Sequence, residues 1–280
     1  MAIVNHPADG MPIEALSARA LELRRHMLAM AQRIGQGYIG QGLGIADLMA
    51  AIYFSELRYD PADPTWADRD RFVMSTGHYS LALWATLAVA GVIPVEELAT
   101  YGGDKSRLDM STLDTTPGVE VIGGSLGQGL GQAVGMALGL RLDKREARVF
   151  CEFSDGELQE GATWEAAMAA ASFKLDNCVA LIDCNGIQAD GSMVIEIEPV
   201  AAKMRAFGWS TQEIDGNDMA AIVAALKTAR ARDSMPKAIV LRTVPGKGVP
   251  TLEGRERAHF VRVDPGEWDA LSEELEMGHG

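Results

Sequence analysis

Apolar residues along the chain recur at two spacings, which predict alternating helices and strands. Between residues 16 and 34 they fall at steps of three and four, as in an amphipathic helix that buries one face. The same criterion predicts helices over residues 45–54, 81–90, 94–101, 162–173, 199–207 and 219–231. Short apolar or extended runs predict strands at residues 71–75, 148–153, 178–183, 208–214 and 237–243. This alternation predicts an α/β fold, a parallel β-sheet with helices on both faces.

No internal repeat or change in composition divides the chain, so we expect a single domain over residues 1–280. Residues 1–12 and the acidic tail at 265–280 are expected to be flexible, as chain ends often are.

Residues 35–44 interrupt the first helix with five glycines. Such a segment is either a flexible linker or a place where the backbone approaches a ligand or another segment closely. The apolar Tyr38, Ile39 and Leu43 within it argue against a plain linker.

A second glycine pattern lies in residues 123–139, which are predicted to begin as a glycine turn and to become a helix. Glycines recur there every four residues and form one smooth stripe, at Gly127, Gly131, Gly135 and Gly139. The stripe suits either close packing within the chain or contact with another chain.

Composition favours a globular protein over a nucleic-acid-binding or membrane-spanning one. With 280 residues, 48% hydrophobic and 23% charged, the chain can bury a substantial core. The net charge of -14 argues against a nucleic-acid-binding surface. Residues 121–140 carry no charge, but their glycines and amides predict a buried helix entry and not a membrane span.

The three cysteines include no C-x-x-C pair, and the N-terminus has no signal-peptide pattern. We therefore expect reduced thiols and a cytoplasmic location.

Oxygen-bearing side chains follow two predicted strands. Asp155-Gly156 ends one strand, and Asn185-Gly186, 30 residues later, ends the next. Because the carboxyl ends of parallel strands meet at one edge of a sheet, these residues should lie together. The Asp155 carboxylate, the Asn185 amide oxygen and the Ile187 carbonyl could hold Mg²⁺, while backbone N–H groups near Gly156 bind phosphate. Taken singly, both dipeptides could also be ordinary turns.

His78 lies where a predicted strand turns into a helix. Ligands commonly bind at such turns in open α/β sheets, although a lone histidine is often structural, so both interpretations stay open.

These motifs resemble a known signature. Residues 153–161 and 183–191 together are similar to the thiamine diphosphate motif of the transketolase family. Residues 66–80, 116–130 and 246–249 also resemble family motifs, the last followed by His259. The resemblance covers most of the chain and implies the thiamine diphosphate-binding fold, in its diphosphate-binding (PP-type) form.

The resemblance also implies roles for individual residues. Asp155, Asn185 and Ile187 would hold Mg²⁺. The remaining cofactor contacts and the catalytic residues follow from the same motifs. Thiamine diphosphate would be bound by His78, Gly124, Leu126, Gly156, Glu157, Asn185, Ile187 and His259, and catalysis would involve His78, His259 and Glu160, the last near an interface between subunits.

Transketolases also carry a second domain that binds the aminopyrimidine of the cofactor, but only 21 residues follow His259 here. The chain therefore resembles the N-terminal, diphosphate-binding subunit of a split transketolase. Such a subunit needs a separate C-terminal, pyrimidine-binding partner, and we expect an α2β2 heterotetramer with no turnover by this chain alone.

The family activity is transfer of a two-carbon ketol unit from a ketose-type or ketone donor to an aldehyde acceptor, which makes the chain a transferase. The alternatives are a 2-oxo acid dehydrogenase α-subunit, a subunit of another thiamine-dependent carboligase, or a non-catalytic partner subunit.

Departures from the family pattern concern the substrate. Tyr38 replaces one substrate-contacting histidine, and the loop 109–112, which includes Ser111, lacks another. We therefore expect an atypical substrate, unless neighbouring residues compensate. Ser154 replaces a glycine of the magnesium loop and should be tolerated if its φ is negative.

Overall fold

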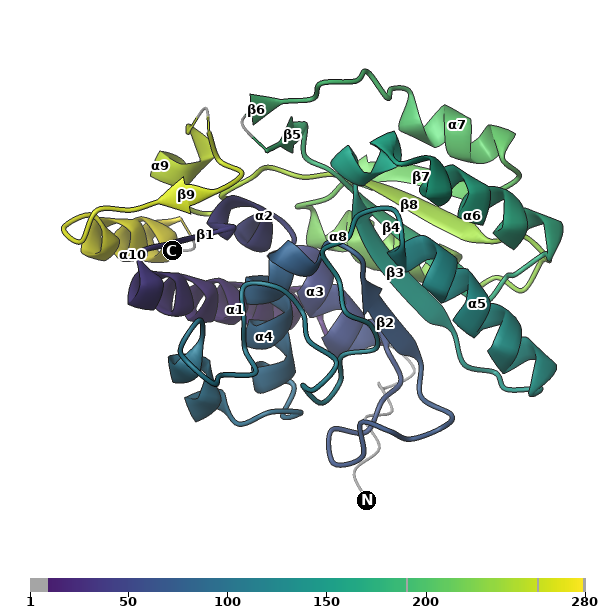
Figure 1. The fold of residues 1–280 in the computed structure, drawn as a ribbon, viewed down its shortest axis with the longest axis horizontal. Helices are drawn as coiled ribbons and strands as arrows, with labels where there is room; N and C mark the ends of the chain where they lie inside the picture. The colour runs from purple at the N-terminus through teal and green to yellow at the C-terminus, as the bar shows by residue number, and fades with distance from the viewer. Residues whose placement is uncertain (1–9, 190, 256, 279–280) are drawn as a thin grey trace.

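A five-stranded parallel sheet forms the centre of the protein (Figure 1). The computed structural model describes residues 10–189, 191–255 and 257–278. In spatial order the strands are β2 (Arg71–Met74), β3 (Val149–Ser154), β4 (Cys178–Cys184), β8 (Lys237–Arg242) and β7 (Ser210–Asp215). Every neighbouring pair is parallel, as the alternation of elements predicts.

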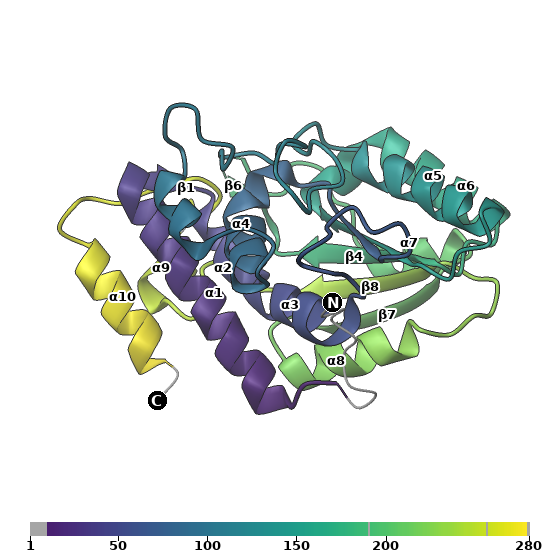
Figure 2. The same cartoon turned by 90° about the horizontal axis from the view of Figure 1, so that it is seen from below.

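Helices cover both faces of this sheet, which confirms the predicted fold class (Figures 1 and 2). One face carries α1 (Ile13–Ile34), α3 (Ala46–Ala51), α4 (Ser80–Val89) and α8 (Met219–Thr228). The other carries α5 (Gly129–Leu142), α6 (Gly161–Ser172) and α7 (Val200–Ala206). Alternate residues of β4 enter the two cores, Leu181 the first and Ile182 the second, because strand side chains point to opposite faces.

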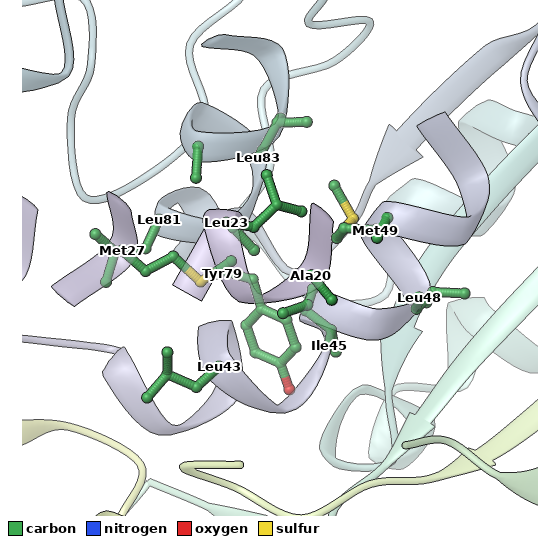
Figure 3. Close-up of a cluster of buried hydrophobic side chains, with 14 of the residues drawn as sticks. Ala20, Leu23, Met27, Leu43, Ile45, Leu48, Met49, Tyr79, Leu81 and Leu83 are labelled. Carbon is green, nitrogen blue, oxygen red and sulfur yellow. The ribbon is translucent and has the colours of Figure 1, made fainter. Parts of the chain in front are cut away.

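The first core is built around α1. Its apolar stripe, which includes Leu23 and Met27, is fully buried against Leu43, Ile45 and Tyr79 (Figure 3). This packing links the first helix to the segment that opens α4 and so fixes the position of His78.

The glycine-rich segment 35–44 is not a linker. It contains β1 (Gln36–Gly37), paired with β9 (Val261–Arg262), and a short helix, α2 (Ile39–Gly44). A Cβ at Gly40 would lie 2.5 Å from the carbonyl oxygen of Ala258, and Gly246 N donates to Gly40 O at 2.8 Å. Glycine is needed because two backbone segments touch here.

Several local elements differ from the prediction. The helix expected at 45–54 is α3 followed by a π-helical turn at Ile52–Glu56, and the one at 94–101 is a 3₁₀ helix at Val95–Thr100. Two short elements flank the site: the hairpin β5 (Ile187–Gln188) with β6 (Gly191–Ser192), and α9 (Pro250–Glu253).

The expectation of a flexible tail at 265–280 was wrong for most of that segment. Helix α10 (Trp268–Met277) buries Trp268, Leu271 and Leu275, and Glu276 accepts two hydrogen bonds of 2.6 Å from Arg25 of α1. The apolar residues of α10 lie three and four positions apart, so they form one face of the helix that packs against the rest of the chain despite the acidic composition of the segment. Residues 1–9 and 279–280 of the segments expected to be flexible lie outside the described residues.

The glycines of the predicted stripe have different surroundings. Gly127 lies before α5 with a φ of 84°, and a Cβ there would lie 2.7 Å from Glu160 Cβ, so the prediction that it shares the helical stripe was wrong. Gly131, Gly135 and Gly139 lie on α5 and have open space beside them. Packing within the described part of the chain therefore does not explain the last three.

None of the helices in the described ranges is both long and apolar enough to span a membrane.

Two loops meet backbone to backbone beside the sheet. A Cβ added at Gly77 would lie 2.3 Å from the carbonyl carbon of Gly123 and 2.6 Å from the nitrogen of Gly124. Because the obstacle is main chain, it cannot rotate away.

We predict that Gly77→Ala lowers the free energy of unfolding by at least about 2 kcal/mol, because the added methyl forces these loops apart. Gly131→Ala is the control: it has open space and lies in α5, so it should stabilise the chain by about 0.5–1 kcal/mol. Urea unfolding of both variants measures the difference; equal stability of the two would contradict the contact.

Candidate functional site

A pocket of about 450 Å³ opens beyond the carboxyl ends of β3 and β4. In Figure 1 the β5–β6 hairpin, α2 and the yellow α9–β9 segment gather on this side of the molecule. The pocket brings together most of the candidate residues from distant parts of the chain. Those that line it are Tyr38, His78, Ser111, Gly124, Leu126, Gly156, Glu160, Ile187 and His259.

Asp155 lies just below the pocket surface and is buried. Its two carboxylate oxygens accept backbone N–H groups from Gly156 at 2.8 Å and from Gly186 at 2.7 Å, so one side chain holds both loops. Burial, opposed by these hydrogen bonds and reinforced by nearby Asp183, raises the pKa of Asp155 to about 7. A bound divalent cation would offset this unfavourable burial of negative charge.

Asn185 is held in one orientation by its neighbours. Its amide nitrogen donates to Asp183 Oδ2 at 2.7 Å and to Tyr79 Oη at 2.9 Å. Its amide oxygen therefore faces away from Asp183 and accepts the N–H of Ile187 at 3.0 Å. An amide oxygen fixed in this way is suited to ligate a cation.

The turn that carries His78 is bound from beneath by three buried carboxylates. Ser75 Oγ donates to Glu157, Thr76 Oγ1 donates to Glu152, and Tyr79 Oη donates to Asp183 at 2.9 Å. Burial, opposed by the hydrogen bond from Thr76, raises the pKa of Glu152 well above its usual range. These contacts explain why a polar turn stays rigid inside an apolar layer.

Glu157 does not line the pocket. Its side chain is fully buried, and its carboxylate accepts the N–H of Gly127 at 2.9 Å as well as the Ser75 hydroxyl. The structure thus places it behind the loops and not at the surface where a cofactor would contact it. The motif alone could not show whether the Glu157 side chain points into the pocket or behind the loops, because a residue in the turn after Asp155 can point either way.

His78 belongs to a cluster of aromatic rings. Its ring centroid lies 4.8 Å from that of Tyr38 and 5.3 Å from that of His259. Burial, with a smaller effect from His259, lowers the pKa of His78 to about 3, so the ring is neutral at physiological pH. A neutral imidazole can both donate and accept a hydrogen bond.

His259 is oriented by Gln41 of α2. Gln41 Nε2 lies 2.6 Å from His259 Nδ1, and the Gln41 side chain is itself buried. If the amide donates to Nδ1, the neutral ring carries its proton on Nε2.

The residues at the departures from the family pattern have structural roles here. Tyr38 stacks edge-on against His78, His259 and Phe260. Ser111 Oγ donates to Gly123 O at 3.0 Å, and Thr112 Oγ1 accepts the Gly123 N–H at 2.7 Å. The loop that lacks a histidine thus supports the glycine turn beside the pocket.

Ser154 ends β3 and pairs with Asp183 in β4, and it is absent from the described residues with positive φ. The condition stated for tolerance of this serine, a φ that is not positive, is therefore met.

Sequence reasoning gave no role to several residues that shape the site: Gln41, Thr76, Tyr79, Glu152 and Asp183. Asp183 opens the motif at residues 183–191 and lies near the end of the apolar strand β4, where an acidic residue is a signal readable from the sequence. The other four become significant only through contacts across distant segments.

The donors present fit a hard cation beside a phosphate. Within the described ranges, no group of three or more His, Cys, Asp and Glu side chains could hold a metal ion, so the site depends on one carboxylate with amide and carbonyl oxygens. Such a set suits Mg²⁺ completed by phosphate oxygens and water. The fold and the pocket thus define an α/β domain with a pocket at the ends of its central strands whose donors suit a phosphate-bearing cofactor.

Comparison with known proteins identifies the family. The family model "Transketolase, thiamine diphosphate binding domain" matches residues 17–278. The chain belongs to the transketolase family, a family of transferases, and carries its thiamine diphosphate-binding domain.

Three relatives match along nearly their whole length. A putative uncharacterized transketolase family protein of Sinorhizobium fredii is 53% identical, over 91% of this chain and 92% of that protein. A 6-deoxy-6-sulfo-D-fructose transketolase subunit of a Clostridium species is 38% identical, over 93% and 96%. An apulose-4-phosphate transketolase subunit of Phocaeicola vulgatus is 36% identical, over 89% of each.

Among solved structures, a transketolase mutant of Pichia stipitis superposes with a TM-score of 0.86 at 28% identity. The match covers 96% of this chain and 41% of that one, so the chain spans less than half the length of this transketolase.

Glu157 gives the metal-free chain a pH-dependent stability. Burial raises its pKa from the usual 4.5 to about 7, against the opposing hydrogen bonds of Ser75 and Gly127. The folded state therefore holds this proton more tightly than the unfolded chain does. The stabilisation is complete below about pH 4.5 and is lost as pH rises to about 7.

Glu157→Gln mimics the protonated side chain, so in EDTA its free energy of unfolding should rise relative to wild type by up to about 3 kcal/mol between pH 4.5 and 7.5. The control Glu273→Gln, at an exposed position of α10, should show no such trend. Parallel pH profiles for wild type and Glu157→Gln would rule out the buried proton.

Proposed function

We propose that this chain is the diphosphate-binding subunit of a split transketolase that requires thiamine diphosphate and Mg²⁺. The observation that carries the proposal is the pair of loops joined by Asp155, where a carboxylate and an oriented Asn185 amide oxygen lie below a pocket lined by histidines. We assign Mg²⁺ to Asp155, Asn185 and the carbonyl of Ile187. Thiamine diphosphate would contact His78, Gly124, Leu126, Gly156, Asn185, Ile187 and His259.

When bound, thiamine diphosphate would supply a centre that stabilises negative charge on the former carbonyl carbon of the donor once the bond beside it breaks. The chain itself binds and orients: neutral His78 and Gln41-bound His259 present N–H donors or ring nitrogens to substrate oxygens. Glu160 lies exposed at the pocket edge, where it can contact a partner chain.

The partner in this proposal is a C-terminal transketolase-like subunit that supplies the pyrimidine-binding site, in an α2β2 assembly. Two relatives of nearly the same length are named as transketolase subunits, which supports a split enzyme. The open glycines on α5 leave a smooth surface available to another chain. We also propose a cytoplasmic location, in keeping with three buried, unpaired cysteines.

We further propose that the donor or acceptor differs from the usual sugar phosphates. By the resemblance to the family motifs, Tyr38 stands in place of a substrate-contacting histidine. The two named relatives act, by their names, on a sulfonated ketose and on apulose 4-phosphate. Family membership favours ketol transfer over the 2-oxo acid dehydrogenase alternative. A non-catalytic subunit remains the second candidate, and cofactor binding separates the two.

Asp155→Asn should weaken thiamine diphosphate binding in the presence of Mg²⁺ by more than about tenfold, because the only carboxylate of the cation site is lost. The matched control Asp143→Asn removes an exposed carboxylate beyond α5 and should leave binding unchanged. Calorimetry with and without Mg²⁺ measures both. Absence of binding even beside the partner subunit would favour the non-catalytic candidate.

The complex of both subunits should show little ketol transfer from xylulose 5-phosphate to ribose 5-phosphate, and the purified chain alone should show none. A ketone and aldehyde screen with the co-purified complex tests the altered substrate. Full activity with the usual pair would refute it, and turnover by the isolated chain would refute the need for a partner.

A further inference from the structure

A second pocket adjoins the cofactor pocket and is strongly basic. Its volume is about 690 Å³, and it shares Tyr38, Ala189 and His259 with the cofactor pocket as a common wall. Three arginines line it, Arg255, Arg257 and Arg262, and none of the described residues that line it is acidic.

This concentration of positive charge is unusual for the chain. The protein has 39 acidic against 25 basic side chains and a net charge of -14. Guanidinium groups gathered at a concave surface are the usual means of binding carboxylate, sulfonate or phosphate groups.

Two of the arginines keep their charge available. Arg255 donates to the carbonyl of Arg262 at 3.0 Å and faces Glu267 at 3.4 Å, so its charge is partly compensated. No described residue forms an ion pair with Arg257 or Arg262, and both are exposed. The hydrogen bond from Arg255 to the Arg262 carbonyl connects the two ends of the segment that carries the three arginines.

The arginine-lined pocket lies where it could contact the end of a substrate that is remote from the cofactor. Arg262 lies on β9 and pairs with Gln36 of β1, and Gln36 precedes Tyr38 by two residues. The Tyr38 ring lies 5.4 Å from His259 and 5.1 Å from Phe260, so these rings separate the reaction pocket from the arginines. Because Tyr38 and His259 line both pockets, a ligand in the cofactor pocket that extended beyond Tyr38 would reach the arginines.

We propose that Arg257 and Arg262, the latter held through its backbone by Arg255, form a binding site for the anionic end group of the substrate, a phosphate or sulfonate remote from the reacting carbonyl. This inference rests on the proposed function. It adds that the diphosphate-binding chain takes part, together with its pyrimidine-binding partner, in selecting substrates with a charged terminus.

The test compares Arg257→Gln/Arg262→Gln with Arg205→Gln/Lys227→Gln, which removes the same charge from α7 and α8. In the co-purified complex, KM is measured for D-glyceraldehyde 3-phosphate and for neutral D-glyceraldehyde as acceptors. The pocket variant should raise KM for the phosphorylated aldehyde by about tenfold or more and leave the neutral one little changed, because charge-assisted contacts to phosphate are lost. The control should behave as wild type.

A second measurement does not depend on turnover. With Mg²⁺ and thiamine diphosphate present, ³¹P line broadening of inorganic phosphate by the full chain should be reduced in the pocket variant and retained in the control. Equal broadening, or equal changes in KM for both aldehydes, would overturn the anion site. A variant that loses only assembly with the partner subunit would also overturn it, in favour of a protein contact.

These outcomes are distinct from failure of the proposed function. Loss of the function would appear as no cofactor binding by wild type and no transfer to either aldehyde, and the phosphate measurement would still decide the anion site.

Discussion

The turn at residues 75–79 is bound to three buried carboxylates, and the rest of the site depends on that attachment. Hydroxyls of Ser75, Thr76 and Tyr79 donate to acids that project from β3, from the loop after it and from β4. Hydrogen bonds in a low-dielectric interior are strong, and an unpaired buried acid is costly, so the turn has few alternative positions. His78 is thereby held at the wall of the pocket, and Asn185 is oriented through Tyr79 and Asp183.

The same region concentrates negative charge where an anionic cofactor is expected to bind. Burial raises the pKa of both Asp155 and Asp183, as for carboxylates that lack a neighbouring cation. A divalent ion between Asp155 and a diphosphate would offset the burial of the carboxylates and also the repulsion between them and the anionic cofactor. The segment with His259 covers the pocket from the opposite side, because glycines at 40 and 246 allow it to contact α2 directly.

Much of this could be predicted from the sequence, because strand ends and glycine turns are local features. The order of elements indicated the parallel sheet, and the Asp155 and Asn185 motifs identified the two loops that the structure brings together. The buried acid Glu152, the role of Gln41 and the position of Glu157 behind the loops could not be predicted, since each depends on contacts between residues far apart in the chain. The prediction of a flexible tail was wrong for α10, because burial of Trp268, Leu271 and Leu275 orders a segment whose composition is acidic.

The central claim is that the loops after β3 and β4 hold a divalent cation together with a diphosphate. The most direct measurement is anomalous diffraction from crystals of the chain grown with thiamine diphosphate and Mn²⁺ in place of Mg²⁺. The account predicts one strong peak bonded to the Asp155 carboxylate, the Asn185 amide oxygen and the Ile187 carbonyl, beside the diphosphate. Cofactor bound without a peak at these ligands, or with the metal elsewhere, would contradict it.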